Sequence, residues 1–450
     1  MASLRRALAC CVLATAAVAT LRLTYKPKVI DKPCLAATWG AAVVQGRAAL
    51  VARVPEDVVC TAQGTSLDSR GHFLACGAVE LRKMPCDNQE CIVVVARGHP
   101  GATSLRVVLH AAYSSQKEAL ADPGDDGGPL PFLGAILADL VLKLPNRRAA
   151  TSSEKPLRGS HSLAQLAQKA LKQETDDDCS RPRWVATEKA LFGRKDRRPM
   201  CGYTSFAHPY AKRGPIARSY ATTCAPPPSV TLPSLEKCVK GVVFAGDSIM
   251  RHVADFLRCE LGHRRVAYTS LRGTSANVTN HIAQLAAVAH PQKTLVLNVA
   301  GLWQVAYGRS DAYERAVARV LEFSKRRFGR VVLAATTAVF PEHFLGRSAC
   351  PRAGAMAAIP LSAARGKRAM TSLRVVAANA AAARAAATLG VDVVDVYAPT
   401  ALAWDDPLTP DDMRHFGSAT TAAIARLMVE AACPALFGAP SKAGRGQAGL

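Results

Sequence analysis

A serine, a histidine and an aspartate in this sequence have the residue types and spacing for nucleophilic catalysis. Ser248 follows Gly246 and Asp247, and Asp412 stands three residues before His415 near the end of the chain. A serine hydroxyl is a weak nucleophile unless a base takes its proton and a third group orients that base. The i, i+3 spacing lets Asp412 hold one imidazole nitrogen of His415 and leave the other free. We therefore predict Ser248 as nucleophile, His415 as base and then acid, and Asp412 as the orienting carboxylate.

The segment around Ser248 is expected to place it at a turn between a strand and a helix. Residues 241–245 are an apolar run typical of a buried strand, and apolar residues recur at helical spacing over residues 249–260. Open α/β folds bind ligands at this edge of the sheet, where the N–H groups of the helix start face a developing anion. Gly-Asp-Ser is also an ordinary helix cap, and Asp-x-x-His recurs by chance, but their combination favours catalysis. Asp247 is expected to brace the turn rather than react.

Strands and helices alternate over the C-terminal part of the chain. This alternation predicts an α/β fold in which helices cover both faces of a parallel sheet. The predicted strands are residues 241–245, 265–269, 294–298, 330–336 and 391–396, and the predicted helices are residues 249–260, 311–327 and 369–389. Residues 347–368 are expected to be an inserted loop near the site.

The N-terminal half has a different hydrophobic pattern. Over residues 34–121, short β-branched segments separated by Pro, Gly and Asp predict a small antiparallel β-sandwich. Residues 122–178 are expected to be a helical linker, with helices at 131–144 and 162–174. A catalytic domain over residues 179–437 and a disordered tail over 438–450 complete the predicted organisation.

The motifs resemble those of a known family. GDSIMRHVADFLRC (246–259) and DDMRHFG (411–417) are similar to the first and last motifs of the SGNH (GDSL) superfamily, specifically its PC-esterase branch. That branch includes trichome-birefringence-like polysaccharide O-acetyltransferases, neurexophilin-and-PC-esterase-domain proteins and sialic acid O-acetyltransferases. The resemblance covers residues 179–434, although no tryptophan precedes Pro199, where the branch has one. It also rests on Cys179, Arg183-Trp184-Val185, Pro199, Cys201, Arg251, Cys259, LVLNVAGLW (295–303) and VDVVDVY (391–397).

The resemblance implies an oxyanion hole made of the Ser248 N–H, a glycine N–H and an asparagine side chain. Such donors are worth about 3 to 4 kcal/mol each in acyl transfer. Asn298, at the end of the strand 294–298, is the candidate asparagine, and Gly273 in SLRGTSAN is the candidate glycine. The alternatives are a strand-end turn for Asn298 and an ordinary loop position for Gly273.

Four further residues of the motifs are expected to support the site. Gly246 and Asp247 shape the nucleophile turn, and Trp303 ends the Asn-x-x-Gly-x-Trp motif that resembles the family pattern. Arg251 is either a structural anchor or a substrate contact. The resemblance also implies an immunoglobulin- or filamin-like fold for the N-terminal sandwich.

The first thirty residues predict entry into the secretory pathway. Arg5 and Arg6 precede an apolar run from Ala7 to Leu21, which is short for a bilayer about 30 Å thick. A cleaved signal peptide and a signal anchor are both open, since Ala-Val-Ala offers a cleavage site. Because the family resides in the Golgi, we expect a single-pass type II membrane protein with a lumenal catalytic domain, and a secreted protein as the alternative.

Cysteine usage fits an oxidising compartment. The chain has 14 cysteines, and disulfides are the default for those outside the apolar run. No Cys-x-x-Cys pair occurs and Cys86-x4-Cys91 has no nearby histidine, so we expect no metal site and no bound cofactor. Odd numbers of cysteines lie before and after residue 150, which predicts either a bridge between the two regions or a free thiol in each.

Net charge and one sequon bear on the partners. A formal charge of +23 attracts polyanions without specifying them, and it is equally consistent with basic residues spread over solvated faces. No nucleic-acid motif is visible. Asn277-Val278-Thr279 is a glycosylation sequon close to Gly273, where a glycan would crowd the site.

The family resemblance implies a carbohydrate O-acetyltransferase. Ser248 would take an acetyl group from a donor, acetyl-CoA or another acyl donor, and pass it to a hydroxyl of a neutral or acidic glycan or polysaccharide. An acetylesterase uses the same residues with water as acceptor, so it is the alternative, and a non-catalytic glycan-binding protein is a third hypothesis. The donor must be supplied by another protein, because one apolar segment forms no transporter.

Overall fold

The computed structural model describes most of residues 39–437. The gaps are residues 45, 54–58, 70–72, 78, 87–88, 99–100, 114–134, 145–157, 173–182, 187–217, 222–229, 262–265, 291–292, 341–369 and 404–413. The predicted N-terminal segment (1–30), the inserted loop (347–368), the tail (438–450) and Asp412 therefore lie outside the described residues. None of the helices that are described is long and apolar enough to cross a membrane.

The C-terminal part is built on a parallel sheet of five strands, in the order β13-β12-β14-β15-β16. The strands are β12 (Val242–Gly246), β13 (Ala267–Ser270), β14 (Thr294–Leu297), β15 (Arg330–Ala334) and β16 (Asp392–Val394). The helices are α4 (Leu232–Lys240), α5 (Ser248–Glu260), α6 (Val278–Ala286), α7 (Gly301–Tyr307), α8 (Tyr313–Arg327), α11 (Ser372–Leu389), α12 (Tyr397–Ala401) and α13 (Ser418–Ala432). Single 3-10 turns lie at Ser275–Asn277 and Pro434–Phe437. The predicted alternation of strand and helix is confirmed.

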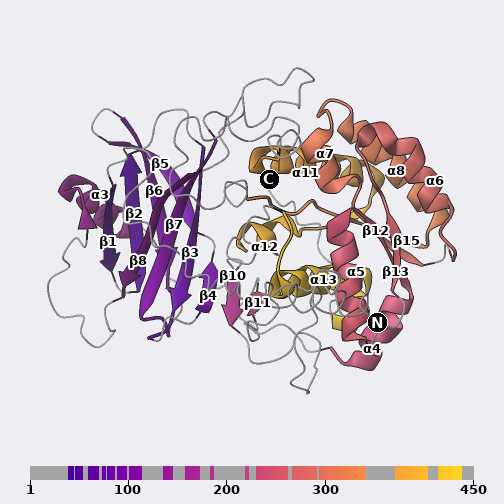
Figure 1. Ribbon diagram of the computed structural model, residues 1–450, viewed down its shortest axis with the longest axis horizontal. Helices are drawn as coiled ribbons and strands as arrows, with labels where there is room; N and C mark the ends of the chain where they lie inside the picture. The colour runs from indigo at the N-terminus through magenta and orange to yellow at the C-terminus, as the bar shows by residue number, and fades with distance from the viewer. Residues whose placement is uncertain are drawn as a thin grey trace, which may run out of the picture.

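Helices cover both faces of this sheet (Figure 1). The middle strand β12 is wholly buried, and its side chains alternate between the two faces, as the pleat requires. Phe244 enters a core shared with α4, α5 and α13, whereas Val243 and Ala245 enter the core of α6, α8 and α11. A sheet buried on both sides gives its strand ends fixed positions, and β12 carries the chain to Ser248.

Two antiparallel sheets form the N-terminal part. One has the order β5-β6-β2-β1-β9 and the other the order β11-β10-β4-β3-β7-β8. Apolar side chains of β1, β2, β6, β7 and β8 meet in a core between the sheets, and α3 covers the outer face of the first sheet (Figure 1). The elements are β1 (Trp39–Val44), β2 (Arg47–Arg53), β3 (Val59–Leu67), β4 (Phe73–Gly77), β5 (Glu80–Cys86), β6 (Gln89–Arg97), β7 (Ser104–Tyr113), β8 (Ala135–Lys143), β9 (Arg158–Gly159), α3 (His161–Lys172), β10 (Arg183–Ala186) and β11 (Arg218–Ala221). The predicted antiparallel β domain before the parallel sheet is confirmed.

The predicted helix over residues 131–144 is wrong. Residues Ala135–Lys143 form strand β8, which pairs antiparallel with β7 along its whole length. Leu140 and Leu142 are buried and Val141 between them is exposed, which is the two-residue period of a strand. Pairing with β7 satisfies the backbone of this segment, so the long-range partner overrides its local helical character. The second predicted helix, 162–174, is confirmed as α3.

The two parts are joined by more than a single linker. Strands β10 and β11, from the region expected to start the catalytic domain, extend the sheet of the β-sandwich through pairing of β10 with β4. Figure 1 shows them between the two halves, and Tyr220 of β11 packs against the core of the parallel sheet. The sandwich is therefore in direct contact with the C-terminal part.

Disulfides occur in both parts, as the cysteine usage predicts. Cys86 and Cys91 close the hairpin of β5 and β6. Cys238 near the end of α4 is bonded to Cys433 at the end of α13, and 195 residues separate them in sequence. This second bridge fastens the first helix of the C-terminal part to its last one.

Candidate active site

The structure brings Ser248 and His415 together from opposite ends of the C-terminal part. Ser248 is the first residue of α5, and His415 precedes α13. The Ser248 Oγ lies 2.8 Å from the His415 Nε2, at a partly buried position. This is hydrogen-bond distance, so the imidazole can take the hydroxyl proton. Asp412, predicted to orient His415, lies outside the described residues, and its role stays a prediction.

Asp247 fixes the turn that presents Ser248. It caps α5, where its Oδ1 accepts a hydrogen bond of 2.9 Å from the Ile249 N–H. Its Oδ2 accepts a second bond of 2.9 Å from the Leu302 N–H at the start of α7. The first bond fixes the turn between β12 and α5, and the second joins this turn to the start of α7, just after β14.

The Asp247 carboxyl group is also part of the electrostatics of the site. It is 3 % exposed, and burial raises its pKa above the ordinary value. The backbone N–H bonds from Leu302 and Ile249 and the nearby charge of His415 offset part of that rise. The net effect favours the neutral carboxyl group more than in water.

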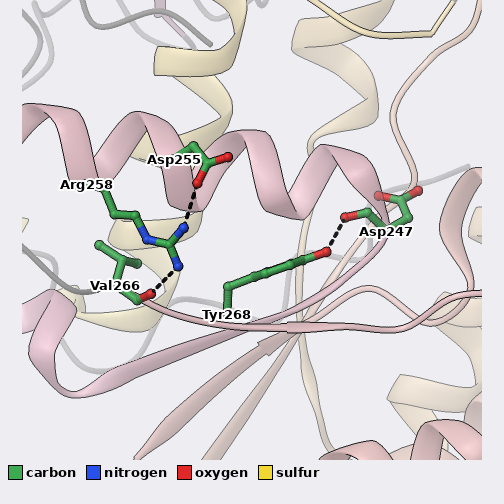
Figure 2. Close-up of polar contacts among 5 residues, drawn as sticks. All are labelled: Asp247, Asp255, Arg258, Val266 and Tyr268. Carbon is green, nitrogen blue, oxygen red and sulfur yellow. Dashed lines mark hydrogen bonds and ion pairs between the residues drawn. The ribbon is translucent and has the colours of Figure 1, made fainter. Parts of the chain in front are cut away.

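The carbonyl groups of the nucleophile turn are held by Tyr268 of β13. Its hydroxyl donates to the Gly246 O at 3.2 Å and to the Asp247 O at 3.1 Å. Figure 2 shows this ring beside Asp247, and further along α5 it shows Arg258 bonding both Asp255 and the Val266 O. Hydrogen bonds thus join the start of α5 to Tyr268 in β13, and the last turn of α5 to Val266 just before β13.

The turn after β14 has an unusual backbone. Ala300 has a positive φ of 61°, and Gly301 follows at 45°, so two successive residues lie in the left-handed region. A Cβ on Gly301 would lie 2.3 Å from the Asp247 Oδ2 and 2.2 Å from the Asn298 Oδ1. The Tyr313 hydroxyl donates to the Val299 O at 2.8 Å and holds the turn from α8. Because Gly301 has no Cβ, the start of α7 can approach Asp247 closely enough for the Leu302 N–H to bond it.

Two tyrosines thus offer a matched test of how the site is supported. Tyr313 and its acceptor Val299 are buried, whereas Tyr268 is partly exposed and water can replace its hydroxyl. We expect Tyr313→Phe to lower the free energy of unfolding by about 2 kcal/mol and Tyr268→Phe by about 1 kcal/mol. Urea denaturation of the two variants measures both values. Equal losses of unfolding free energy in the two variants would show that burial of the carbonyl acceptor does not determine the strength of these hydrogen bonds.

A loop that carries Gly273 lies against the nucleophile turn. The Leu271 N–H donates to the Gly246 O at 2.8 Å, and the Ser275 N–H donates to the Gln304 Oε1 of α7 at the same distance. Gly273 has a φ of 98°, a conformation that favours glycine. This loop is therefore bonded to both β12 and α7, on either side of Ser248.

Two of the three predicted oxyanion donors are in suitable places. The Ser248 N–H is at the first position of α5, where helix geometry provides no acceptor and favours an anion. The Gly273 N–H has no acceptor among the described residues. The Nδ2 of Asn298, in contrast, donates to the Ala334 O at 2.9 Å and to the Thr336 Oγ1 at 3.4 Å. In this structure Asn298 therefore braces β14 against β15, and its part in an oxyanion hole stays a prediction.

The remaining predicted residues lie around this centre. Arg251 is half-buried on α5, one turn after Ser248, and its charge acts on Tyr268. Trp303 is exposed on α7. The Asn277 Oδ1 accepts a hydrogen bond from the Thr274 N–H, so this side chain folds back onto the Gly273 loop. Its glycosylation stays a prediction.

Residues that the sequence did not single out complete the site. The His252 ring is buried against the His415 ring, with centroids 4.9 Å apart. Its only signal in the sequence is its position one helical turn after Ser248. Leu302 and Tyr268 have no such signal, since one acts through its backbone and the other comes from a strand paired at long range.

His281 of α6 supports the Gly273 loop from behind. It is 0 % exposed, and its Nε2 donates to the Arg272 O at 3.1 Å. Burial lowers the pKa of His281, and the bond to Arg272 opposes part of that effect. The folded protein thus favours the neutral imidazole.

This leads to an expected dependence of stability on pH. A histidine with a lowered pKa in the folded state contributes stability above its unfolded value of about 6.5, and that contribution is lost as the pH falls below it. Between pH 7.5 and 5.5, the free energy of unfolding should fall more steeply for the wild type than for His281→Gln. Gln retains a donor for the Arg272 O. Replacement of the exposed His161 on α3 by Gln is the control, and it should leave the slope unchanged.

Comparisons with known proteins found similar solved structures but no similar sequence. No protein-family model matches the sequence, and no curated protein sequence matches it. A solved structure of a lipolytic protein of the G-D-S-L family from Veillonella parvula is similar, with 16% identity and a TM-score of 0.30 over 42% of this chain and 96% of that one. A candidate SGNH hydrolase from Slackia heliotrinireducens has 23% identity and a TM-score of 0.28 over 42% and 96%. An acetyl xylan esterase from Geobacillus stearothermophilus has 14% identity and a TM-score of 0.26 over 44% and 94%.

Proposed function

We propose that this chain is a serine-dependent acyl-transfer enzyme of the SGNH type. The observation that carries the proposal is the 2.8 Å distance between the Ser248 Oγ and the His415 Nε2 at the carboxyl edge of a parallel sheet. Two available N–H groups, those of Ser248 and Gly273, lie on structures bonded to the same turn. A nucleophile, a base and anion donors are the parts that acyl transfer requires.

The reaction proceeds in two halves. The Ser248 Oγ forms a bond with the acyl carbon of the donor while His415 takes the hydroxyl proton, and the N–H groups of Ser248 and Gly273 bind the oxyanion. The bond to the leaving group then breaks as that group takes the proton from His415. In the second half, His415 removes a proton from the acceptor hydroxyl while the acceptor oxygen forms a bond with the acyl carbon. The bond between that carbon and the Ser248 Oγ then breaks, and the Ser248 Oγ takes the proton from His415. On our prediction, Asp412 stabilises the imidazolium, and Asp247 holds the turn that presents Ser248.

For the finer function we propose carbohydrate O-acetyl transfer. The donor is acetyl-CoA or another acyl donor, and the acceptor is a hydroxyl of a glycan or polysaccharide, which the charge of +23 allows to be acidic. We place the protein in the Golgi membrane through its N-terminal segment, with the active site in the lumen. Support comes from the family resemblance and from the disulfides, which suit an oxidising compartment.

Acetyl ester hydrolysis is the second candidate. The same residues perform it with water as acceptor, and one similar solved structure is an acetyl xylan esterase. The full chain should be incubated with a labelled acetyl donor and a panel of neutral and acidic oligosaccharides. Acetyl label on Ser248 followed by labelled oligosaccharide supports the transferase. Labelled Ser248 with release of acetate alone supports the esterase, and an unlabelled Ser248 contradicts both.

A further inference from the structure

An aromatic pair on α7 is exposed beside the nucleophile turn. Trp303 is 41 % exposed and Tyr307 is 48 % exposed. They stand four residues apart on one face of α7, with ring centroids 5.7 Å apart and an angle of 31° between the planes. Large aromatic side chains that share an exposed surface commonly mark a binding site.

The start of α7 fixes this pair relative to the reaction centre. The Leu302 N–H, one residue before Trp303, donates to the Asp247 Oδ2 at 2.9 Å, and Asp247 is the neighbour of Ser248 in the chain. The left-handed turn at Ala300 and Gly301 makes this approach possible. Trp303 is therefore one residue from a direct contact with the nucleophile turn.

The rest of α7 is anchored by buried polar groups. Gln304 is 2 % exposed and bridges the Ser275 N–H, at 2.8 Å, and the Arg309 O, at 2.7 Å. Arg374 of α11 is 4 % exposed and donates to the Val305 O at 3.0 Å and to the Gly308 O at 2.8 Å. Both ends of the helix are thus fixed, while the two aromatic rings on it reach solvent. A rigid helix that presents two exposed rings suits a binding platform, because little conformational entropy is lost on binding.

The chemistry of the rings selects the ligand. The face of an aromatic ring carries partial negative charge. A pyranose ring with equatorial substituents presents axial C–H groups of partial positive charge on a flat apolar face, which is complementary to it. The 5.7 Å between the two centroids is comparable with the length of one pyranose residue in a chain.

We propose that Trp303 and Tyr307 form a stacking platform for pyranose residues of the oligosaccharide that reacts at Ser248. The inference rests on the proposed function and names its substrate class. A sugar stacked on α7 lies beside the nucleophile turn, so the platform orients a hydroxyl or an acetyl ester of the same chain toward Ser248. The platform recognises the sugar face and is indifferent to the acyl group.

Binding to a catalytically inactive protein tests the platform directly. Full-length Ser248→Ala protein is titrated in a calorimeter with xylohexaose and with a β-linked hexamer of glucuronic acid, because the ring substituents of both sugars are equatorial. Adding Trp303→Ala, or Tyr307→Ala, is expected to weaken binding at least tenfold, and Trp303→Tyr is expected to restore most of it. Val393→Ala, at another exposed apolar position, is the control that leaves affinity unchanged. Thermal unfolding of each variant confirms that it is folded.

The outcomes separate this inference from the proposed function. Oligosaccharide affinity that is unchanged in the Trp303 and Tyr307 variants overturns the platform, and so does a lack of binding to either hexamer. Cleavage of 4-nitrophenyl acetate by the wild type needs no sugar contact, so its presence in those cases leaves the proposed function standing. Binding of the acidic hexamer alone would support the platform and assign it an acidic glycan.

Discussion

Replacing Ser248 with alanine is expected to lower kcat for 4-nitrophenyl acetate by about 10⁵-fold, with little change in stability. Loss of the nucleophile from a Ser-His pair removes the covalent route, and the oxyanion donors alone retain only a small residual rate. The Ser248 side chain is at the partly buried start of α5, where alanine fits without a cavity. Initial rates of 4-nitrophenolate release, together with mass spectrometry of the protein after mixing, measure the effect and the acyl intermediate.

The control for this prediction is another serine in the first turn of a helix. Ser234 of α4 is not one of the predicted site residues. Among the described residues, its Oγ accepts a hydrogen bond from the Thr231 Oγ1. Ser234→Ala should retain the rate of the wild type and its acyl adduct. If Ser248→Ala protein cleaved the ester within tenfold of the wild-type rate, Ser248 would not be the nucleophile.

Replacing Gly301 with alanine is expected to lower the free energy of unfolding by about 3 to 4 kcal/mol. A left-handed conformation costs a residue with a Cβ about 1 to 2 kcal/mol, and overpacking adds a similar amount. The new Cβ would meet Asp247 and Asn298 at 2.2 to 2.3 Å. Neither can move aside easily, because Asp247 holds two backbone N–H groups and Asn298 is bonded to the Ala334 O. Any displacement of Asp247 shifts Ser248, so kcat should also fall by about 10²-fold.

A second glycine separates backbone strain from crowding. Gly390 after α11 has a φ of 62° but nothing within 4 Å of the Cβ position. Gly390→Ala should therefore lose about 1 kcal/mol and keep its full activity. Urea denaturation and ester cleavage compare the two variants. Similar losses of stability and activity in both variants would mean that crowding of Asp247 by a Cβ at position 301 does not destabilise the site.

Much of the catalytic fold was predictable because its signals are local. The apolar run before Gly246 and the helical spacing after Ser248 gave β12 and α5 to within one or two residues. The Ser248 and His415 pair was predictable because motif spacing and family resemblance agreed, and the sheet brings both to one edge. Short elements of a parallel sheet buried on both faces have strong hydrophobic patterns.

The rest depended on long-range partners that leave little trace in the sequence. Residues 131–144 have apolar spacing compatible with a helix, and only β7 decides that they form β8. Asn298 ends its strand as predicted, yet the Ala334 carbonyl on the neighbouring strand takes its amide donor. The left-handed conformation of Ala300 likewise has no local cause, because Tyr313 and Asp247, from other elements, hold the residues on either side of it.

The bond between Cys238 and Cys433 has a mechanical consequence. Tension applied to the chain before Cys238 and after Cys433 passes directly through the two sulfur atoms. The strands β12 to β16, Ser248 and His415 all lie between these two cysteines, in a covalently closed loop that such a pull leaves unstretched.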